Sequence, residues 1–259
     1  MKQRKEGSAL KSVAFTSYAE SVPAALSAVG AEKLFAQNRP ILIKPNLVTD
    51  VPHPVTTHPD CCEAVVLFAR MAGARDIIIA EGSGDPNQST MEIFRKLGYF
   101  SLAERHNVRL VDLNEEPCET REIPSLRVFP TMHLPAVARE RFIVSVPVLK
   151  AHSLACMTGT LKNMMGFAPP SHYAGRYGVW KKAAFHEDMH EAIRDLNRYV
   201  TPGLTLLDAS VGLCTYHLGG PRCRPPVARI LAGTDPLAVD REAARLLGLD
   251  WRSIDHLRD

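Results

Sequence analysis

The sequence has no apolar run that approaches the ~20 residues a membrane-spanning helix needs. Its first residues, MKQRKEGSALKSVAF, are basic but lack the long apolar core of a secretion signal. The net charge is only +3 over 259 residues, with acidic and basic residues interspersed. Such mild charge argues against nucleic acid or a membrane surface as a partner. We therefore expect a cytoplasmic protein with no nucleic-acid and no membrane partner.

The six cysteines lack the two-residue spacing of zinc ribbons, redox motifs and ferredoxin-type clusters. They lie at positions 61, 62, 118, 156, 214 and 223. A chain of this length can build its core without disulfides, so we expect mostly reduced, structural cysteines. Cys61 and Cys62, just after His58 and Pro59, are the one pair that we retain as a metal or redox candidate.

Short runs rich in valine, isoleucine and leucine predict buried strands. The runs are continuous rather than alternating, which is typical of strands covered on both faces. They are SVAFTSY, PILIKPNLV, ARDIIIAEG, VRLVDLN, RFIVSVPVL, LTLLDAS and ARILAGT. Helical patterns over residues 58–73, 89–106, 185–200 and 235–249 lie between many of them. This alternation predicts an α/β fold with a mostly parallel sheet and helices on both faces.

A single α/β domain over residues 1–259 is the expected organisation, since no internal repeat or low-complexity tract is present. The rhythm breaks at residues 115–140, which fit a hairpin, an edge excursion or the joint between two lobes. Residues 168–182, APPSHYAGRYGVWKK, form a long loop rich in glycine, proline and aromatics. Such a length favours a lid or a binding loop.

Ligands of open α/β sheets bind beyond the carboxyl ends of the strands, so polar residues just after a strand are the ones to inspect. In ILIKPNLVTD, Lys44 and Asn46 end a strand. Residues two apart share a face, so both can point at one ligand. Alternatively, the Lys44 side chain reaches solvent and Asn46 makes a turn.

Two glycines follow the strand in IIIAEGSGDP, and Gly82 and Gly84 can let backbone N–H groups approach an anion. A plain turn explains the same pattern, and the full dinucleotide fingerprint is absent. Glu81 would repel a phosphate if it faced inward.

The segment VPVLKAHSLACMTGTLKNMMG, residues 146–166, places positive charge in an otherwise apolar run. Lys150 and His152 end a strand and share a face. We expect residues 153–166 to form a helix or helical turn capped by Ser153, with Lys162 and Asn163 late in that element. A lysine near a helix C-terminus also complements the helix dipole, which is the structural alternative for Lys162.

Three aspartates follow later strands. Asp208 in LTLLDAS is expected to orient His152 or to pair with a lysine. Asp235 precedes a proline and is more simply a helix cap, and Asp240 follows it. Pairing of the lysines with these aspartates would make the chain an inert scaffold.

The stretch HEDMH, residues 186–190, matches the His-Glu-x-x-His pattern of zinc proteases. Asp188 puts a charge where those enzymes usually have an apolar residue. The apolar stripe of Phe185, Met189 and Ile193 lies to one side of the histidines. We therefore predict no metal site here.

Several segments together resemble the family catalogued as domain of unknown function 362. They span roughly residues 40–250 in the expected order: IKPNLV, TTHPD, AEGSG, FRKLGY, VPVLKAH…TGTLKNMMG, EAIRDLN, LLDASVGL…GGP and AGTDPLAVD. Many relatives carry ferredoxin-like iron–sulfur cysteines, which this chain lacks. The family is distantly similar in architecture to nickel-dependent lactate racemases, but too few residues match to carry nickel chemistry across. The resemblance implies a fold and a site location.

Together these observations predict a cationic pocket at the carboxyl edge of the sheet. Its expected residues are Lys44, Asn46, Lys150, His152, Lys162 and Asn163. A buried, uncompensated ammonium either loses its proton or binds an anion, so we expect a small anionic ligand: a carboxylate, an enolate or a phosphate.

We hypothesise an enzyme in which Lys150 and Lys162 hold the ligand and stabilise developing negative charge. His152 would transfer protons near neutral pH, with Asp208 fixing a neighbour. The resemblance slightly favours redox chemistry, with a flavin or a partner iron–sulfur protein, over isomerisation. The alternative is a non-catalytic anion-binding module that serves a partner enzyme. A homodimer is the expected assembly for this size and class.

Overall fold

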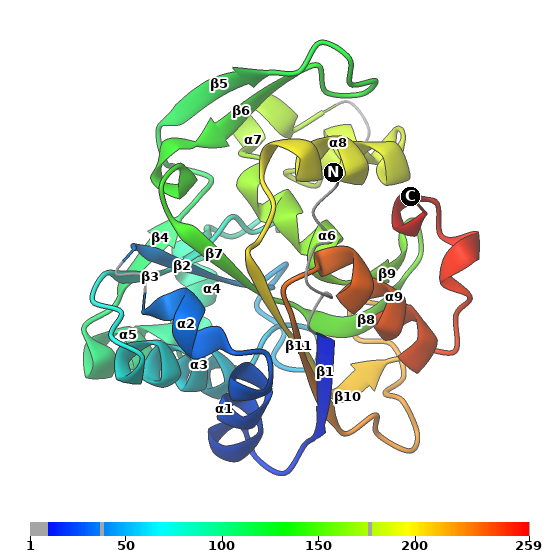
Figure 1. The fold of residues 1–259 in the computed structure, drawn as a ribbon. Coiled ribbons are helices and arrows are strands. Elements are labelled where there is room, and N and C mark those ends of the chain that lie inside the picture. The colour runs from blue at the N-terminus through cyan, green and yellow to red at the C-terminus, as the bar shows by residue number, and fades with distance from the viewer. Residues whose placement is uncertain (1–9, 37–38, 176–177, 259) are drawn as a thin grey trace, which may run out of the picture.

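The computed structural model describes residues 10–36, 39–175 and 178–258. Its central element is a sheet that brings together strands from the whole length of the chain (Figure 1). The strands, in chain order, are β1 (Leu10–Ala14), β2 (Ile41–Pro45), β3 (Ile77–Glu81), β4 (Arg109–Asp112), β7 (Phe142–Val146), β8 (Val148–His152), β9 (Cys156–Thr158), β10 (Leu204–Leu213) and β11 (Arg229–Gly233).

The sheet is mostly parallel, as the strand–helix alternation predicts. Its order is β1-β11-β10-β7-β2-β3-β4, and the neighbours from β10 to β4 are parallel. β11 runs antiparallel to both β10 and β1. β8 pairs with β10 in parallel and with β9 antiparallel, which extends the sheet beyond the end of β7. The predicted α/β class is therefore confirmed.

Helices cover both faces of the sheet, and the strands bury side chains toward each. In β2, Ile41 and Ile43 belong to one apolar cluster and Leu42 to the other, because successive residues of a strand point to opposite faces. The first cluster includes α1 (Tyr18–Ala28), α2 (Ala31–Phe35), α3 (Pro59–Met71), α4 (Thr90–Lys96) and α5 (Tyr99–His106). The second includes α6 (Thr160–Asn163), α7 (Pro170–Tyr173), α8 (Met189–Tyr199) and α9 (Pro236–Leu246).

Two helix predictions need correction. The pattern over residues 89–106 forms two helices, α4 and α5, because Gly98 adopts φ 84°, which the right-handed helix excludes. The helix expected over residues 153–166 is wrong in its first half. Cys156–Thr158 is instead the strand β9, and α6 begins only at Thr160, so Ser153 caps no helix.

The irregular segment at residues 115–140 contains a hairpin of β5 (Cys118–Glu122) and β6 (Thr131–Pro135), which was one of the three alternatives. A short 3₁₀ turn, η1 (Ala136–Ala138), follows it. Met132 and Leu134 of β6 lie in the same apolar cluster as α8. The hairpin therefore packs onto the core beside α7 and α8 (Figure 1).

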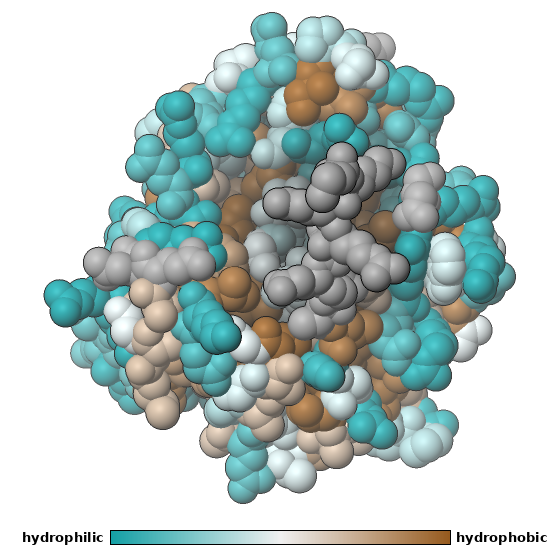
Figure 2. Space-filling model, in the orientation of Figure 1, coloured by the Kyte–Doolittle hydropathy of each residue, from teal (hydrophilic) through white to brown (hydrophobic). Residues whose placement is uncertain are grey.

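The remaining 3₁₀ turns lie in the second half of the chain. They are η2 (Met164–Phe167), η3 (Ala183–His186), η4 (Trp251–Ser253) and η5 (Asp255–Leu257). Hydrophilic residues occupy most of the periphery of the face in Figure 2, while apolar ones gather toward its middle. None of the helices in the described ranges has the length and hydrophobicity of a membrane span.

Candidate functional site

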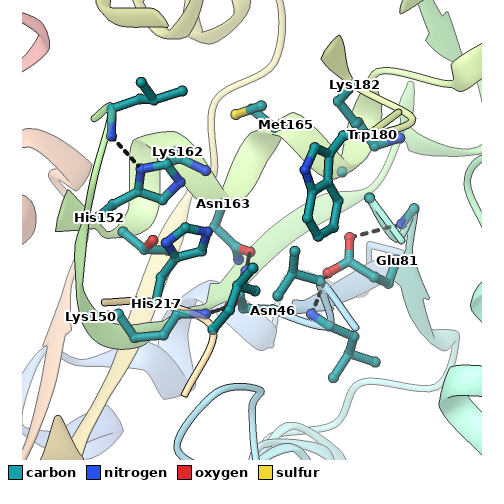
Figure 3. Close-up of a pocket in the computed structure, with 18 of the residues that line it drawn as sticks. Asn46, Glu81, Lys150, His152, Lys162, Asn163, Met165, Trp180, Lys182 and His217 are labelled. Carbon is teal, nitrogen blue, oxygen red and sulfur yellow. Dashed lines mark hydrogen bonds between the residues drawn. The ribbon is translucent and has the colours of Figure 1, made fainter. Parts of the chain in front are cut away.

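A cavity of about 220 Å³ lies beyond the carboxyl ends of β2, β3 and β8. The strand-end residues predicted from the sequence line it together with α6 and two loops. Lys150, Lys162, His152 and His217 lie at one end of this pocket, and Glu81, Trp180 and Lys182 at the other (Figure 3). The fold thus brings Lys44, Asn46, Lys150, His152, Lys162 and Asn163 to a single site, as predicted.

Lys44 is wholly buried and forms an ion pair with Glu81, Nζ to Oε1, at 2.7 Å. Its Nζ also donates to Pro45 O at 2.8 Å and to Asn163 Oδ1 at 3.2 Å. Burial lowers the pKa of Lys44, and the Glu81 carboxylate opposes that shift. Glu81 therefore faces inward, and its charge is matched by a lysine rather than left to repel a ligand.

Two glycines allow this ion pair to fit beneath the pocket. A Cβ on Gly166 would overlap Glu81 Oε1 and Lys44 Cε, and a Cβ on Gly82 would overlap the Gly166 carbonyl oxygen. The Gly82 N–H donates to Glu81 Oε1 at 2.8 Å, so it is not free to hold a ligand. Gly82 and Gly84 both line the pocket, but the N–H of Gly82 already has a partner in Glu81, so of the two only the Gly84 N–H keeps the predicted anion-binding role as a prediction.

Lys150 is buried, and none of the carboxylates in the described part of the chain forms an ion pair with it. Its Nζ donates to Asn46 Oδ1 at 2.6 Å and to Val55 O at 2.6 Å. Burial, assisted by the positive charge of Lys162, lowers the pKa of Lys150 to about 7. Asn46 in turn donates to Asn163 Oδ1 at 3.3 Å, which joins the two amides into one network. The environment therefore holds Lys150 near the midpoint of its titration at neutral pH.

Lys162 differs from the other pocket lysines because its Nζ has neither a hydrogen bond nor an ion pair within residues 10–36, 39–175 and 178–258. Its side chain is half-buried, unlike those of Lys44, Lys150 and Lys182, and partial desolvation lowers its pKa to about 8. It lies on the short helix α6, whose first N–H groups donate to Asp240: Thr160 N at 2.6 Å and Leu161 N at 2.9 Å. Asp240 thus fixes the helix that presents Lys162; the pairing with a lysine considered for it from the sequence is replaced by hydrogen bonds to the backbone of α6.

The His152 imidazole is held in one tautomer. Its Nδ1 accepts from Leu154 N at 3.1 Å and from Ala155 N at 3.2 Å, so the proton of the neutral ring is on Nε2. Burial and the charge of Lys162 lower the pKa of His152 well below its usual range. The prediction that His152 exchanges protons near neutral pH therefore needs correction, because these contacts favour a neutral ring that donates from Nε2.

His217 stacks on His152, with ring centroids 3.9 Å apart and planes at 19°. Its Nδ1 is buried without a hydrogen-bond partner among the described residues, and burial lowers its pKa to about 3. His217 was not predicted from the sequence, because the family resemblance in the loop between β10 and β11 covers only the Gly-Gly-Pro at residues 219–221. Only its place after a buried strand could have indicated it.

The loop at residues 168–182 contributes Trp180 and Lys182 to the pocket, so this segment does line the site. Lys182 Nζ donates to Asn114 Oδ1 at 2.6 Å and to Ala168 O at 2.5 Å. Burial lowers the pKa of Lys182 to about 7, and Glu81 opposes the shift. Sequence reasoning missed this residue because two adjacent lysines at the end of a loop usually face solvent.

Asp208 does not reach the pocket. It lies in β10 and is wholly buried. Its carboxylate accepts a hydrogen bond from Tyr18 Oη at 2.8 Å and forms an ion pair with His53 Nε2 at 3.2 Å. Burial opposes its ionisation, but the hydrogen bond and charge of His53 bring its pKa below the usual value. The prediction that Asp208 orients His152 or a pocket lysine is therefore wrong, since odd and even positions of the strand face different surroundings.

The remaining candidates are Asp235 and the two histidines of the HEDMH stretch. Asp235 caps α9 by accepting from Leu237 N at 3.0 Å, as predicted. His190 lies on α8 with its Nδ1 2.8 Å from His256 Nδ1, whereas His186 lines the pocket. The described residues contain no cluster of three or more histidine, cysteine or acidic side chains placed to hold a metal ion.

Cys61 and Cys62 are wholly buried within α3, and burial raises the pKa of both thiols, that of Cys62 to about 12. A thiol must lose its proton to ligate a metal or to exchange with a disulfide. The described residues also place no third ligand side chain with this pair, so the structure gives the metal or redox interpretation no support.

Comparison with known proteins bears on the whole arrangement. A search of curated proteins finds no match to the chain. A family model described as domain of unknown function (DUF362) matches residues 41–245. The matched region includes all the pocket residues predicted from the sequence, from Lys44 to Asn163, and most of the sheet. The agreement of the model over most of the chain shows that this protein belongs to the DUF362 family.

Proposed function

We propose that the chain is an enzyme that binds a small organic anion, a carboxylate, enolate or phosphate, and transfers a proton on it. The observation that carries this proposal is the state of Lys162 and Lys150. Lys162 has no polar partner in the described part of the chain, and Lys150 has only two neutral acceptors. Two ammonium groups in one cavity without a carboxylate against them favour an anionic guest.

Anion binding would replace the missing counter-charge. A carboxylate or phosphate beside Lys162 accepts a charge-assisted hydrogen bond from its ammonium group, which is about twice as strong as a neutral one. The Nε2–H of His152 supplies a second donor in the same end of the pocket. The Lys44–Glu81 pair beneath contributes little net charge, because the two groups compensate each other.

Proton transfer is assigned to Lys150. At its pKa of about 7, a large fraction of the amine is unprotonated at neutral pH, which suits a general base. The two N–H bonds of the neutral amine go to Asn46 Oδ1 and Val55 O, which leaves the lone pair for a substrate proton. Lys162 and His152 would stabilise the negative charge that develops on the substrate oxygen.

A second candidate function is a non-catalytic anion-binding module. It is favoured by the neutral state of both imidazoles, which equips them to donate hydrogen bonds rather than to relay protons. In this version Lys150 and Lys162 hold the anion for another protein and Lys150 acts only as a donor.

The two functions separate in one experiment. The chain is incubated in D₂O with a panel of 2-hydroxy and 2-oxo carboxylates and phosphorylated acids, and proton NMR follows loss of the carbon-bound proton at C2, or at C3 in the 2-oxo acids, whose C2 carries no proton. We expect exchange on at least one compound, abolished in Lys150→Met and in Lys162→Met. Lys33→Met, which alters an exposed lysine of α2, is the matched control and should exchange as the parent does.

Thermal shift against the same panel reports binding independently of chemistry. Stabilisation that disappears in Lys162→Met, with no exchange on any compound, would favour the binding module. No stabilisation and no exchange with any anion would contradict both functions.

A further inference from the structure

Two cysteines lie at the base of the loop that carries His217. Cys214 and Cys223 flank an antiparallel bridge between Leu213 and Arg222. Cys214 N donates to Pro221 O at 3.0 Å, and Cys223 N donates to Gly212 O at 3.0 Å. Residues adjacent to a bridged pair point to the opposite face from that pair, so the two cysteine side chains share one face.

The two thiols are neighbours. Burial and then the charge of the adjacent Cys214 raise the pKa of Cys223, and the Cys214 thiol donates to Pro221 O at 3.3 Å. Both cysteines are free, Cys214 is exposed and Cys223 is half-buried. A reagent from solvent can therefore reach Cys214, and the second thiol is already beside it.

The other cysteines lack this arrangement. Cys61 and Cys62 are wholly buried in α3, which shields them from solvent. Cys118 and Cys156 are as accessible as Cys214, but they lie on β5 and β9, in different sheets. These two exposed cysteines provide internal comparators for reactivity.

We propose that Cys214 and Cys223 form a redox-active dithiol whose oxidant is a small anionic disulfide. Arg222 and Arg224 are exposed and adjacent to Cys223 in the chain; Arg222 points to the opposite face of the bridge, so the two arginines act through the positive charge they give the base of the loop, which favours a negatively charged partner. The sequence contains no motif that predicts this pair, because the two cysteines are not closely spaced and the loop between them brings them together.

The reaction is a thiol–disulfide exchange in two steps. The Cys214 thiolate attacks one sulfur of the small disulfide, forms a mixed disulfide and releases one small thiolate. The Cys223 thiol then gives up its proton, attacks the Cys214 sulfur and releases the second small thiol. The protein loses two protons and two electrons, and the small disulfide gains them.

The resulting disulfide would close the loop at its base. Tyr216, His217 and Leu218, between the two cysteines, line the pocket, and His217 stacks on His152. Fixing the base of the loop restricts the positions open to His217. The thiol chemistry does not depend on the proposed anion, so the two proposals can fail separately.

The test uses the full chain, reduced and then treated with oxidised glutathione. Peptide mapping should show a cross-link between Cys214 and Cys223, a mass lower by about 2 Da, and no lasting glutathione on either residue. Loss of these two thiols should be about tenfold faster than modification of Cys118 or Cys156. Neutral hydroxyethyl disulfide should react more slowly than glutathione with the parent, and the difference should shrink in Arg222→Gln.

Single variants supply the control. Cys214→Ser should leave Cys223 unreactive or singly glutathionylated, Cys223→Ser should retain glutathione on Cys214, and Cys118→Ser should form the cross-link as the parent does. Stable mixed disulfides on the parent, or equal reactivity of Cys118 and Cys214, would overturn the proposal. Slower amide exchange of residues 215–222 in the oxidised chain would support closure of the loop, and unchanged exchange would contradict it.

Discussion

His217 lies parallel to His152 at 3.9 Å between ring centroids, and neither imidazole contacts a carboxylate among the described residues. A histidine that works as a base usually has a group that stabilises its charged form. Here the neighbours are Lys162 and Lys150, which penalise a second positive charge. The two stacked imidazoles are therefore uncharged and line the pocket as hydrogen-bond donors.

The first prediction concerns the tautomer and protonation state of His152. We expect nitrogen-15 NMR of labelled histidine to show the Nε2–H tautomer of His152 throughout pH 5–8, because two backbone N–H groups occupy Nδ1. The urea-unfolded chain provides the reference in which every ring titrates. A His152 signal that moves toward the doubly protonated ring within this interval would contradict the assignment.

The second prediction concerns the glycines beneath the pocket. Gly166→Ala should destabilise the fold by about 2–4 kcal/mol, because its Cβ would displace the buried Lys44–Glu81 pair. Gly84→Ala is the matched control: the nearest atom to its Cβ is Val48 Cγ2 at 3.8 Å, an ordinary contact. Urea unfolding at pH 7 measures both, and equal stability of the two variants would refute the packing role of Gly166.

The third prediction follows from the lysine pKa values. Burial lowers the pKa of Lys150 and Lys182 to about 7 from the ordinary 10.5, so above pH 7 the unfolded chain holds more protons than the folded one. Their penalty on folding is complete below pH 7 and diminishes as the pH rises. Each should add up to about 1.4 kcal/mol to the unfolding free energy per pH unit.

Urea unfolding at several values between pH 7 and 9 measures this slope. Lys150→Met should reduce the slope by the share of one lysine, while Lys33→Met should leave it unchanged. Parallel profiles for the parent and Lys150→Met would show that Lys150 keeps an ordinary pKa in the folded chain.

The fourth prediction concerns Asp240, which supports Lys162 through the first turn of α6. Asp240→Ala removes the acceptor of Thr160 N and Leu161 N, and it should lower stability by about 1–3 kcal/mol. Anion affinity should also fall, because Lys162 loses its fixed position. Asp235→Ala, which removes a cap on α9 outside the pocket, should reduce stability but preserve anion affinity. A loss of affinity as large in Asp235→Ala would indicate a general effect of unfolding.

Strand periodicity explains why much of the site could be predicted. Lys44 and Asn46, or Lys150 and His152, stand two apart at the end of a strand, so sharing a face follows from the backbone alone. The parallel sheet then brings those ends to one edge. The partners of these residues could not be predicted in the same way, since Glu81 was read as a repulsive group and is instead the counter-charge of Lys44.

Strand pairing and the course of the loops account for what the sequence did not predict. β9 forms because Cys156–Thr158 pairs with β8 in a tight hairpin, which outweighs the local helical pattern. His217 and Lys182 come from loops whose course depends on the rest of the fold. Asp208 shows the converse: a polar residue at a buried strand found partners in α1 and the loop before α3, away from the pocket.

The proximity of Lys150 and Lys162 has a thermodynamic consequence for any guest of the cavity. An anion beside Lys162 raises the pKa of that amine, so binding above neutral pH takes up hydrogen ions from the medium, while Lys150 stays the group that accepts the substrate proton. The heat of association should then vary with the ionisation enthalpy of the buffer, and affinity should weaken as the solution becomes more alkaline. Anion affinity in this cavity would therefore depend on pH through the protonation of the Lys162 amine.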